Sequence, residues 1–362
     1  MFLTIIIAFI SLIGLIVLHE FGHFVLAKKF GVKVEEFGVG YPPRIIGKKI
    51  GETIYSLNLL PFGAFVKIYG EEGGEALAKD HRSFTGKPVW QRALIILGGV
   101  ISFWVISAIL LSIVMGLGTP TAVEDEANHT LRDPKVQIVA VAPGSPAEKV
   151  GIKAGDTIKQ LTINNQPLII NKIKEVQEFT DLHKGEEVIL TIERGKEVLD
   201  VLLVPRVSPP EGEGAMGVAL VRTAIKSYRG FQAPWQGIIT TGNLTIAAVK
   251  GWAQALGNVI RGRPVGVQLM GPVGILSLFT QISQLGVNYF LQFIAIISIY
   301  IALFNILPIP ALDGGKLLFL GIEAVRKRPV SPKIEQQITG IFFALLIALM
   351  VFVTVKDIQR LF

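Results

Sequence analysis

Hydrophobic and polar positions divide this chain of 362 residues into four long apolar runs and the polar segments between them. The runs that lack Asp, Glu, Lys and Arg are residues 2–18, 93–117, 290–307 and 341–355, and the last can be extended at both ends. A helix needs about 20 apolar residues to cross a bilayer. Because the first run has neither the basic start nor the small-residue cleavage site of a secretory signal peptide, a retained span is favoured. We therefore predict a polytopic α-helical membrane protein with four transmembrane helices.

The polar segment after the first run contains two stretches with the alternation of β-strands. Residues 32–40 and 53–60 alternate between apolar and polar positions, and Pro42 and Pro43 interrupt the chain between them. The second stretch continues into residues 60–66, which are too apolar for an ordinary soluble loop. The pattern predicts a β-hairpin or small sheet. Either it is associated with the membrane, where protein or a substrate strand covers its edge, or it is a small hairpin in the cytoplasm.

A polar, strand-rich segment follows the second run and predicts an inserted α/β domain. Its pattern is that of strands, Gly/Pro turns and a short helix, with a hairpin around Arg194 and Gly195. A linker rich in Pro, Gly and Glu comes next, and then an amphipathic helix expected at the membrane interface. The predicted parts are an N-terminal membrane part at 1–118, the inserted domain at 125–207, an interfacial and re-entrant region at 215–289 and a C-terminal membrane part at 290–362.

Basic residues predict the orientation of the chain. Lys and Arg are dense in the loop before the second run and in the loop between the third and fourth runs. Loops of this kind lie in the cytoplasm. Both termini and the inserted domain are therefore expected to be extracytoplasmic, and the first and third runs end at the cytoplasmic side.

Composition supports a membrane protein and narrows its chemistry. The chain is 51% hydrophobic and only 17% charged, with a net charge of +7, whereas a soluble chain carries about a quarter charged residues. The expected partner is the lipid bilayer, and the sequence lacks the basic, aromatic-interleaved patches typical of nucleic-acid binding. Cysteine is absent, so that any metal must be held by nitrogen and oxygen ligands.

A His-Glu-x-x-His motif lies at the end of the first run. In a helix, His19 and His23 lie one turn apart on the same face, and Glu20 is adjacent. Two imidazoles at this spacing can ligate one Zn²⁺, and the neighbouring carboxylate can act as general base without occupying a coordination position. Ionisable side chains are costly in a membrane helix unless they are paired or functional, which favours a metallohydrolase site over a chance match.

The third run ends in a second set of polar groups at the same membrane depth. Asp313 is the only acidic residue between positions 290 and 320, so it can supply a third ligand, although Asp-Gly is also a common turn pair. Three protein ligands would leave one position open, as in catalytic zinc sites. Pro308 and Pro310 must unwind the span. Asn305 either contacts substrate or satisfies the freed backbone.

Together these motifs resemble the site-2 protease family of intramembrane zinc metalloproteases, and most closely its regulator of sigma E protease branch with one PDZ domain. The resemblance covers nearly the whole chain: the motif at 19–23, the strand segment at 38–40, the PDZ-like segment at 143–158, the Gly-Pro-Val-Gly-Ile segment at 271–275 and the segment at 305–315. It implies a bacterial inner-membrane protease that cleaves single-pass membrane proteins, typically anti-sigma factors of a stress response or signal-peptide remnants.

The resemblance also implies roles for particular residues. His19, His23 and Asp313 would bind zinc, and Glu20 would be the catalytic base. The residues expected to contact or line the path of an unwound substrate are Asn58, Leu59, Gly63, Asn305, Pro308 and Pro310.

One feature departs from the family pattern. PDZ domains bind peptide carboxyl ends through an apolar-Gly-apolar loop before a groove strand, and no such loop precedes Val136. The inserted domain is therefore expected to act as a size filter that excludes bulky ectodomains. The alternative for the whole chain is a PDZ-containing membrane scaffold or chaperone with a non-catalytic metal site.

Overall fold

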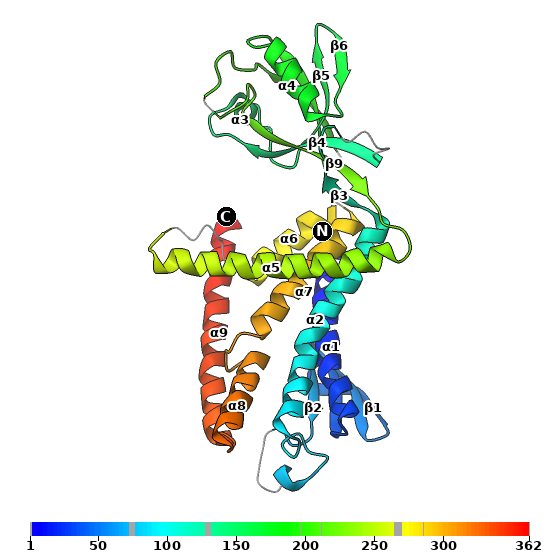
Figure 1. Cartoon of the computed structure of the whole chain (residues 1–362), viewed down its shortest axis with the longest axis vertical. Coiled ribbons are helices and arrows are strands. Elements are labelled where there is room, and N and C mark those ends of the chain that lie inside the picture. Colours follow the sequence, from blue (N-terminus) through cyan, green and yellow to red (C-terminus); the bar gives the residue numbers. More distant parts are fainter. Residues whose placement is uncertain are drawn as a thin grey trace. The chain divides into compact units, whose positions relative to one another are not determined.

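The computed structural model describes residues 2–71, 77–126, 132–195, 197–210, 212–263, 270–284 and 286–361 (Figure 1). The chain forms two compact units. One combines residues 1–113 with 234–362, and the other is the continuous segment 114–233.

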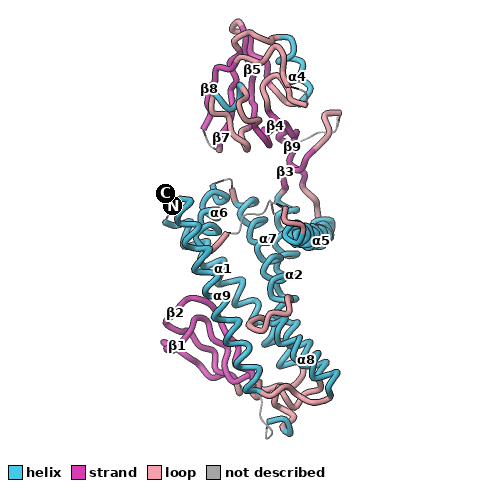
Figure 2. The backbone as a smooth tube through the Cα atoms, turned by 90° about the vertical axis from the view of Figure 1, so that its left-hand side faces the viewer, coloured by secondary structure: helices cyan, strands magenta, loops and turns pink. Residues whose placement is uncertain are grey.

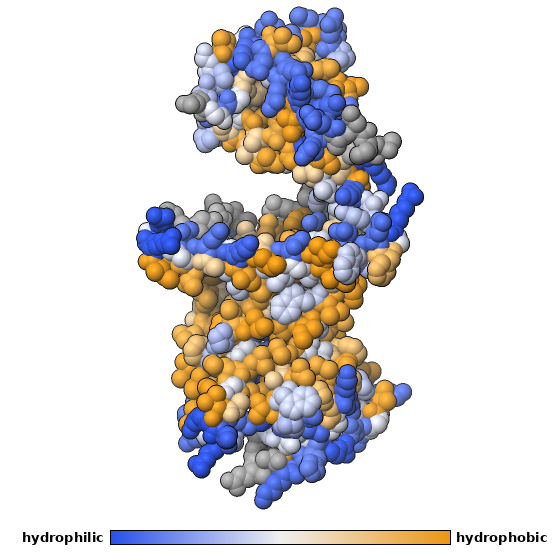
Figure 3. Space-filling view, viewed as in Figure 1, coloured by the Kyte–Doolittle hydropathy of each residue, from blue (hydrophilic) through white to orange (hydrophobic). Residues whose placement is uncertain are grey.

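The first unit is helical and carries the predicted spans. Its helices are α1 (Phe2–Lys29), α2 (Val89–Leu117), α5 (Gln232–Ile260), α6 (Pro272–Gln284), α7 (Val287–Asn305), α8 (Asp313–Arg326) and α9 (Pro332–Leu361), with a short 3₁₀ helix at Leu77–Lys79. In the described residues, four helices are long and apolar enough to cross a membrane, namely α1, α2, α7 and α9. Figure 3 shows the hydrophobic surface that these helices present, with hydrophilic residues near its lower end. The prediction of four apolar spans is confirmed.

Helices α1 and α2 pack with their backbones almost in contact. A methyl group on Gly22 would lie 2.3 Å from the carbonyl oxygen of Gly98, so neither helix can carry a side chain at this crossing. Close packing through small residues is the usual way for membrane helices to associate. The crossing lies next to His23 and therefore sets the distance between the motif helix and α2.

Helix α5 is longer at both ends than the amphipathic helix that the sequence predicts. Trp104 of α2 donates its indole N–H to Thr245 at 3.2 Å, and Trp252 packs against Tyr300 of α7. Figure 3 shows hydrophilic residues along one side of α5 and hydrophobic residues along the other. The location of this helix at a membrane interface remains a prediction.

The hairpin strands are much longer than their alternation predicts. β1 (Val34–Ile50) and β2 (Thr53–Ile68) are joined by a two-residue turn, so Pro42 and Pro43 lie inside a strand rather than in a loop. Several register shifts accommodate them. The apolar segment 60–66 is part of β2, and Phe37 has partners on both sides, Val66 and Tyr55. The sheet lies beside α1 (Figure 2).

The second unit is a seven-stranded sheet with two short helices. The strand order is β3 (Thr119–Ala122), β9 (Val218–Lys226), β4 (Arg132–Val141), β5 (Thr157–Ile163), β7 (Val188–Arg194) and β8 (Glu197–Leu203), and β6 (Gln166–Ile169) pairs with β5. The helices are α3 (Pro146–Lys149) and α4 (Ile173–Leu182). β7 and β8 form the predicted hairpin around Arg194.

A buried carboxylate secures the turn before β5. Asp156 is 1% exposed and accepts hydrogen bonds at 2.7 Å from both Nε and Nη2 of Arg194, and one from the Lys153 N–H. Burial alone would raise the pKa of Asp156, but the hydrogen bonds from Arg194 and Lys153 outweigh it and lower that pKa. The side chain is therefore ionised at neutral pH.

The boundaries predicted for the inserted domain, 125–207, are too narrow. β9 lies beyond the Pro- and Gly-rich linker, yet it pairs with β4 along most of its length and with β3 at its end. The compact unit therefore runs from Val114 to Ala233. The linker does not end the domain because the chain returns after it to add an internal strand, which local composition cannot reveal.

Candidate active site

Side chains from two distant parts of the sequence converge on one point in the first unit. His19 and His23 of α1 have their Nε2 atoms 3.3 Å apart, and each lies 3.3 Å from Oδ2 of Asp313, the first residue of α8. All three residues are buried, with 9%, 7% and 8% of their surfaces exposed. They are the one group of His, Asp and Glu residues in the described ranges whose ligand atoms lie close enough to share a metal ion.

The three ligand atoms fit a tetrahedral zinc ion. A tetrahedron with zinc–ligand bonds of about 2.0–2.1 Å has edges of about 3.3–3.4 Å, which matches the separations of 3.3 Å. Oδ2 of Asp313 is buried without a hydrogen-bond partner. A buried carboxylate oxygen left in this way is costly unless a cation neutralises it.

Neighbouring groups orient the two imidazoles. Nδ1 of His23 lies 3.0 Å from the carbonyl oxygen of Ile95 on α2, so a proton on Nδ1 donates to that carbonyl and leaves Nε2 free as a ligand. The ring of His19 stacks on Phe103, with ring centroids 4.7 Å apart. Helix α2 thus contacts and orients both rings.

The chain between α7 and α8 places Asp313. The span ends at Asn305, before Pro308 and Pro310, and α8 begins at Asp313 itself. The intervening segment folds back so tightly that a methyl group on Gly315 would lie 2.3 Å from the carbonyl oxygen of Ile309. Glycine after Asp313 therefore permits the turn that returns the carboxylate to the histidines.

Glu20 lies on the wall of a cavity of about 190 Å³ that His23 and Asp313 also line. Its Oε2 accepts a hydrogen bond of 3.1 Å from the backbone N–H of Val66 on β2. The other lining residues are Tyr41, Ala64, Phe65, Val66, Ile68, Glu71, Phe84, Ile95, Ile96 and Lys316. The edge of the hairpin sheet therefore borders the same space as His23 and Asp313.

Comparison with known proteins identifies the family. The family model for peptidase family M50 matches residues 7–349. The chain belongs to peptidase family M50. It is 34% identical over 360 residues to a candidate zinc metalloprotease of Clostridium perfringens, with 98% of each chain covered. It is 29% identical to the zinc metalloprotease RasP of Geobacillus kaustophilus, covering 99% of this chain and 98% of the relative, and 27% identical over the full length of both chains to the regulator of sigma-W protease RasP of Bacillus subtilis.

This M50 peptidase is a zinc metalloprotease, and Zn²⁺ is its cofactor. The sequence-based predictions of enzyme class and metal are confirmed. The absence of cysteine agrees with a site built from imidazole and carboxylate.

The residues expected to contact substrate on the hairpin lie outside the lining of the Glu20 cavity. Asn58 is buried and donates its amide to the carbonyl oxygen of Gly40 at 3.1 Å and to the Ser56 hydroxyl at 3.2 Å, so it supports the sheet from within. Leu59 is exposed, and Gly63 packs beside the ring of Tyr41. It is the next residues of β2, Ala64 to Val66, that border the cavity.

The residues expected on α7 and after it form the helix end and the loop to α8. The Asn305 amide donates to the carbonyl oxygen of Ile301 at 3.0 Å, which agrees with the alternative that it satisfies the backbone near the proline break. The Pro310 carbonyl oxygen accepts a hydrogen bond from Thr339 of α9. Contacts of Asn305, Pro308 and Pro310 with substrate remain predictions.

Sequence reasoning missed two groups beside the site. Lys316, one turn after Asp313, makes an ion pair of 2.5 Å with Glu71, in the turn just beyond β2, and so links the chain after the sheet to α8. Its spacing of three residues from Asp313 in a helix could have indicated that Lys316 lies beside the site. The Val66 N–H had no sequence signal, because any residue in a strand carries the same group.

Gly99 is expected to be essential for the position of His23. A methyl group at this position would lie 2.1 Å from Nε2 of His23, the atom proposed as a ligand. Gly99→Ala should therefore displace the imidazole and lower peptidase activity about a hundredfold, since small misplacements of catalytic groups have effects of this size. Zinc content and cleavage rate of the purified variant measure the effect. Gly14→Ala is the matched control, because nothing lies within 4 Å of its added methyl. Equal activity of the two variants would contradict the proposed packing.

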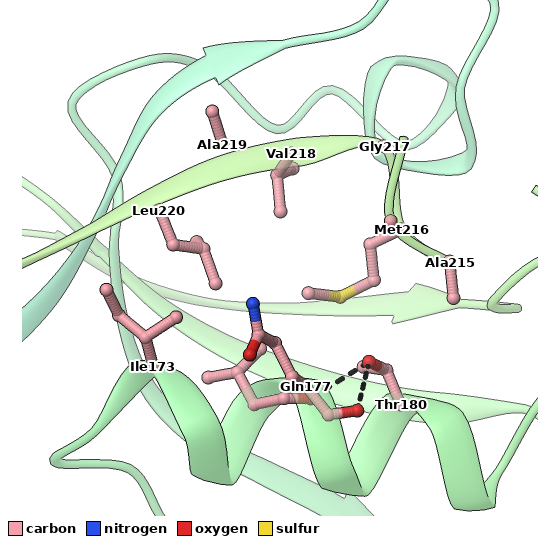
Figure 4. Close-up of a pocket in the computed structure, with 11 residues that line it drawn as sticks. Ile173, Gln177, Thr180, Ala215, Met216, Gly217, Val218, Ala219 and Leu220 are labelled. Atoms are coloured by element: carbon pink, nitrogen blue, oxygen red, sulfur yellow. Dashed lines mark hydrogen bonds between the residues drawn. The ribbon is translucent and has the colours of Figure 1, made fainter. Parts of the chain in front are cut away.

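A second concave site lies in the other unit, between α4 and β9. Figure 4 shows Val218 and Leu220 of β9 and Met216 facing Ile173, Gln177 and Thr180 of α4. The groove encloses about 230 Å³.

The backbone of β9 is open along this groove. The N–H of Val123 donates to the carbonyl oxygen of Arg222, which marks the edge of β9 that faces away from β4. The backbone groups of alternate residues in a strand point to the same edge. Leu220 and Val218 therefore direct their N–H and C=O groups to this edge, along the groove. At its closed end, the N–H groups of Ala215 and Met216 have no acceptor within the described part of the chain.

Proposed function

We propose that this M50 peptidase hydrolyses peptide bonds within or near the transmembrane segment of single-pass membrane proteins, with zinc held by His19, His23 and Asp313 and with Glu20 as general base. The observation that carries the proposal is the triangle of candidate ligand atoms 3.3 Å apart, buried where the uncharged run of α1 ends. A buried metal-binding group at this position would serve a substrate that is itself in the membrane.

Zinc bound by these residues would supply Lewis-acid polarisation of the peptide carbonyl and of water. Glu20, on the wall of the same cavity, would take a proton from the attacking water and pass it to the leaving amine. The Val66 N–H holds the Glu20 carboxylate in place, and Ile95 and Phe103 hold the two imidazoles.

The sheet edge offers a way to present an unwound substrate. Ala64, Val66 and Ile68 line the Glu20 cavity with one edge of β2, while β1 pairs with the other. An extended peptide added to such an edge exchanges its helical hydrogen bonds for sheet hydrogen bonds. The backbone to be cleaved would then lie next to Glu20.

The proposal also includes the membrane, the orientation and the substrates that the family resemblance implies. We expect the bacterial inner membrane, with both termini and the inserted unit extracytoplasmic, because the loops rich in Lys and Arg follow the positive-inside rule. Anti-sigma factors and signal-peptide remnants are the expected substrates. The name of the Bacillus subtilis relative, a regulator of sigma-W protease, is consistent with a role in regulated proteolysis.

Cells that produce wild-type protein or Glu20→Gln protein test the function directly. Mass spectrometry of membrane fractions should show single-pass proteins or their stubs accumulating in the variant, with fragments cut inside the apolar segment only in the wild type. The protein should bind zinc in both cells. Zinc binding without any difference between the two fragment patterns would instead favour the scaffold or chaperone function.

For the second unit we propose a PDZ-like domain that binds the carboxyl end of an extended peptide in the groove between α4 and β9. An apolar-Gly-apolar sequence, which is missing before β4, stands before β9 as Met216, Gly217 and Val218. The unpaired N–H groups of Ala215 and Met216 could donate hydrogen bonds to a carboxylate. This replaces the expectation that the domain lacks a peptide-binding loop, and a size-filter role is compatible with it.

Two variants of the full-length protein separate peptide binding from size exclusion. Leu220→Asp places a charge in the groove, and should weaken binding of peptides with an apolar carboxyl end about tenfold without changing cleavage of a substrate that has no outer domain. Deletion of residues 125–205 should additionally allow cleavage of substrates with bulky outer domains. The variant Val198→Asp, on exposed β8, is the control. Undiminished peptide binding by the Leu220→Asp protein would rule out the groove.

A further inference from the structure

A second and larger cavity adjoins the Glu20 cavity in the first unit. It encloses about 720 Å³ and lies between the end of β2, the loop at Pro310 and Ala311, and the first turns of α9. Five residues line both cavities: Phe65, Val66, Ile68, Glu71 and Lys316. A peptide strand laid along the β2 edge past Glu20 would therefore continue into this second space.

The charges on its wall leave one carboxylate without a partner. Glu35 pairs with Lys67 at 3.2 Å, and Glu71 pairs with Lys316 at 2.5 Å. Glu335, on the first turn of α9, is half-buried and makes no ion pair within the described ranges. Among the described lining residues the two pairs cancel, which leaves one net negative charge, at Glu335.

The position of the cavity in the unit indicates which part of a substrate would reach it. Basic residues stand at one end of each of helices α1, α2 and α8, namely Lys28, Arg92 and Arg326, of which Lys28 pairs with Glu52 and Arg92 with Glu323. Membrane segments carry Lys and Arg on their cytoplasmic flank. A substrate whose membrane segment ends at the same level would bring basic residues of its own to this depth.

We propose that the cavity binds the flanking residues of the substrate on this side of the cleaved bond, and that Glu335 selects a Lys or Arg side chain among them. The inference rests on the proposed proteolysis of membrane segments and names a feature of the substrates. Glu335 is a specificity residue here and takes no part in the chemistry, because it lies on α9, away from the lining of the Glu20 cavity.

The test uses full-length zinc-loaded protein in proteoliposomes and synthetic single-pass peptides. Each peptide has an apolar span of about 20 residues and a flank of Ser and Ala. One position of the flank is Lys, Gln or Glu, and this position is moved stepwise away from the span across the series. Wild-type protein should cleave the best Lys peptide with a kcat/KM about fivefold above that of the matching Glu peptide, the range expected for a partly solvated ion pair. The difference should lie mainly in KM.

Substitutions that change the charge at position 335 should change the preference for Lys over Glu in the substrate flank. Glu335→Gln should remove most of it, and Glu335→Lys should reverse it in favour of the Glu peptide. Gln337→Glu adds an acidic residue on the same helix outside the cavity lining and should keep the wild-type preference. If Glu335→Gln keeps the wild-type ratio, or if Glu335→Lys does not reverse it, the inference is wrong.

The same assay separates this inference from the proposed function. If wild-type protein cleaves no peptide of the series faster than Glu20→Gln protein, it is the proteolysis of membrane segments that fails, and the subsite fails with it. If wild-type protein cleaves them without any charge preference, the proteolysis stands and the Glu335 subsite is overturned.

Discussion

Glu20→Gln protein is expected to keep its zinc and to lose at least about a hundredfold in kcat, the size of effect that loss of a general base produces. Glutamine preserves the shape of the side chain and can still contact the Val66 N–H through its amide oxygen, as the Glu20 carboxylate does at 3.1 Å. It cannot accept the proton of the attacking water. Because Glu20 does not belong to the triangle of ligand atoms, metal binding should not change.

Cleavage of a single-pass substrate by purified protein, measured beside zinc content by mass spectrometry, tests this expectation. Glu323→Gln is a suitable control, since Glu323 pairs with Arg92 between α8 and α2, outside the cavity lining. An active Glu20→Gln protein would remove the general-base assignment, and a zinc-free one would show that Glu20 is a ligand.

His23→Ala protein is expected to lose both zinc and activity. Nε2 of His23 lies 3.3 Å from the other two ligand atoms, so its removal leaves two ligands at a site that needs three. Zinc content should fall from about one ion per chain to less than a tenth. Asp313→Ala should behave in the same way, because it supplies the oxygen ligand.

Zinc titration after dialysis against a chelator measures this loss. Wild-type protein should regain its activity in proportion to the zinc added back, and His23→Ala protein should regain none. His183→Ala is the control, because His183 lies at the end of α4 and pairs with Glu186. Full zinc content in the His23→Ala protein would contradict the proposed ligand set.

The sequence was sufficient to predict that His19, His23 and Asp313 lie together, because membrane helices make ionisable residues conspicuous. His19 and His23 stand at the end of an uncharged run, and Asp313 is the only acidic residue for many positions around it. The same reasoning predicted the unwound chain at Pro308, which the structure shows between α7 and α8. Each of these features depends on residue type and spacing within one helix.

Features that depend on pairing between distant segments could not be predicted in this way. β9 joins the sheet of the second unit across a linker, and the apolar-Gly-apolar loop therefore precedes β9 and not β4. The extension of β1 through Pro42 and Pro43 depends on bulges that local alternation does not reveal. The Val66 N–H reaches Glu20 only because the sheet edge packs beside α1.

The central claim is that two imidazoles and one carboxylate share a single zinc ion. X-ray absorption at the zinc edge, recorded on Glu20→Gln protein to prevent turnover, reports the identity of the ligands directly. We expect a first shell of nitrogen and oxygen atoms with the scattering of two imidazoles, unchanged when His183 is replaced by alanine, whereas His19→Ala protein should bind too little zinc to give such a shell. A shell with no imidazole contribution, or a full zinc shell in the His19→Ala protein, would contradict the proposed ligand set.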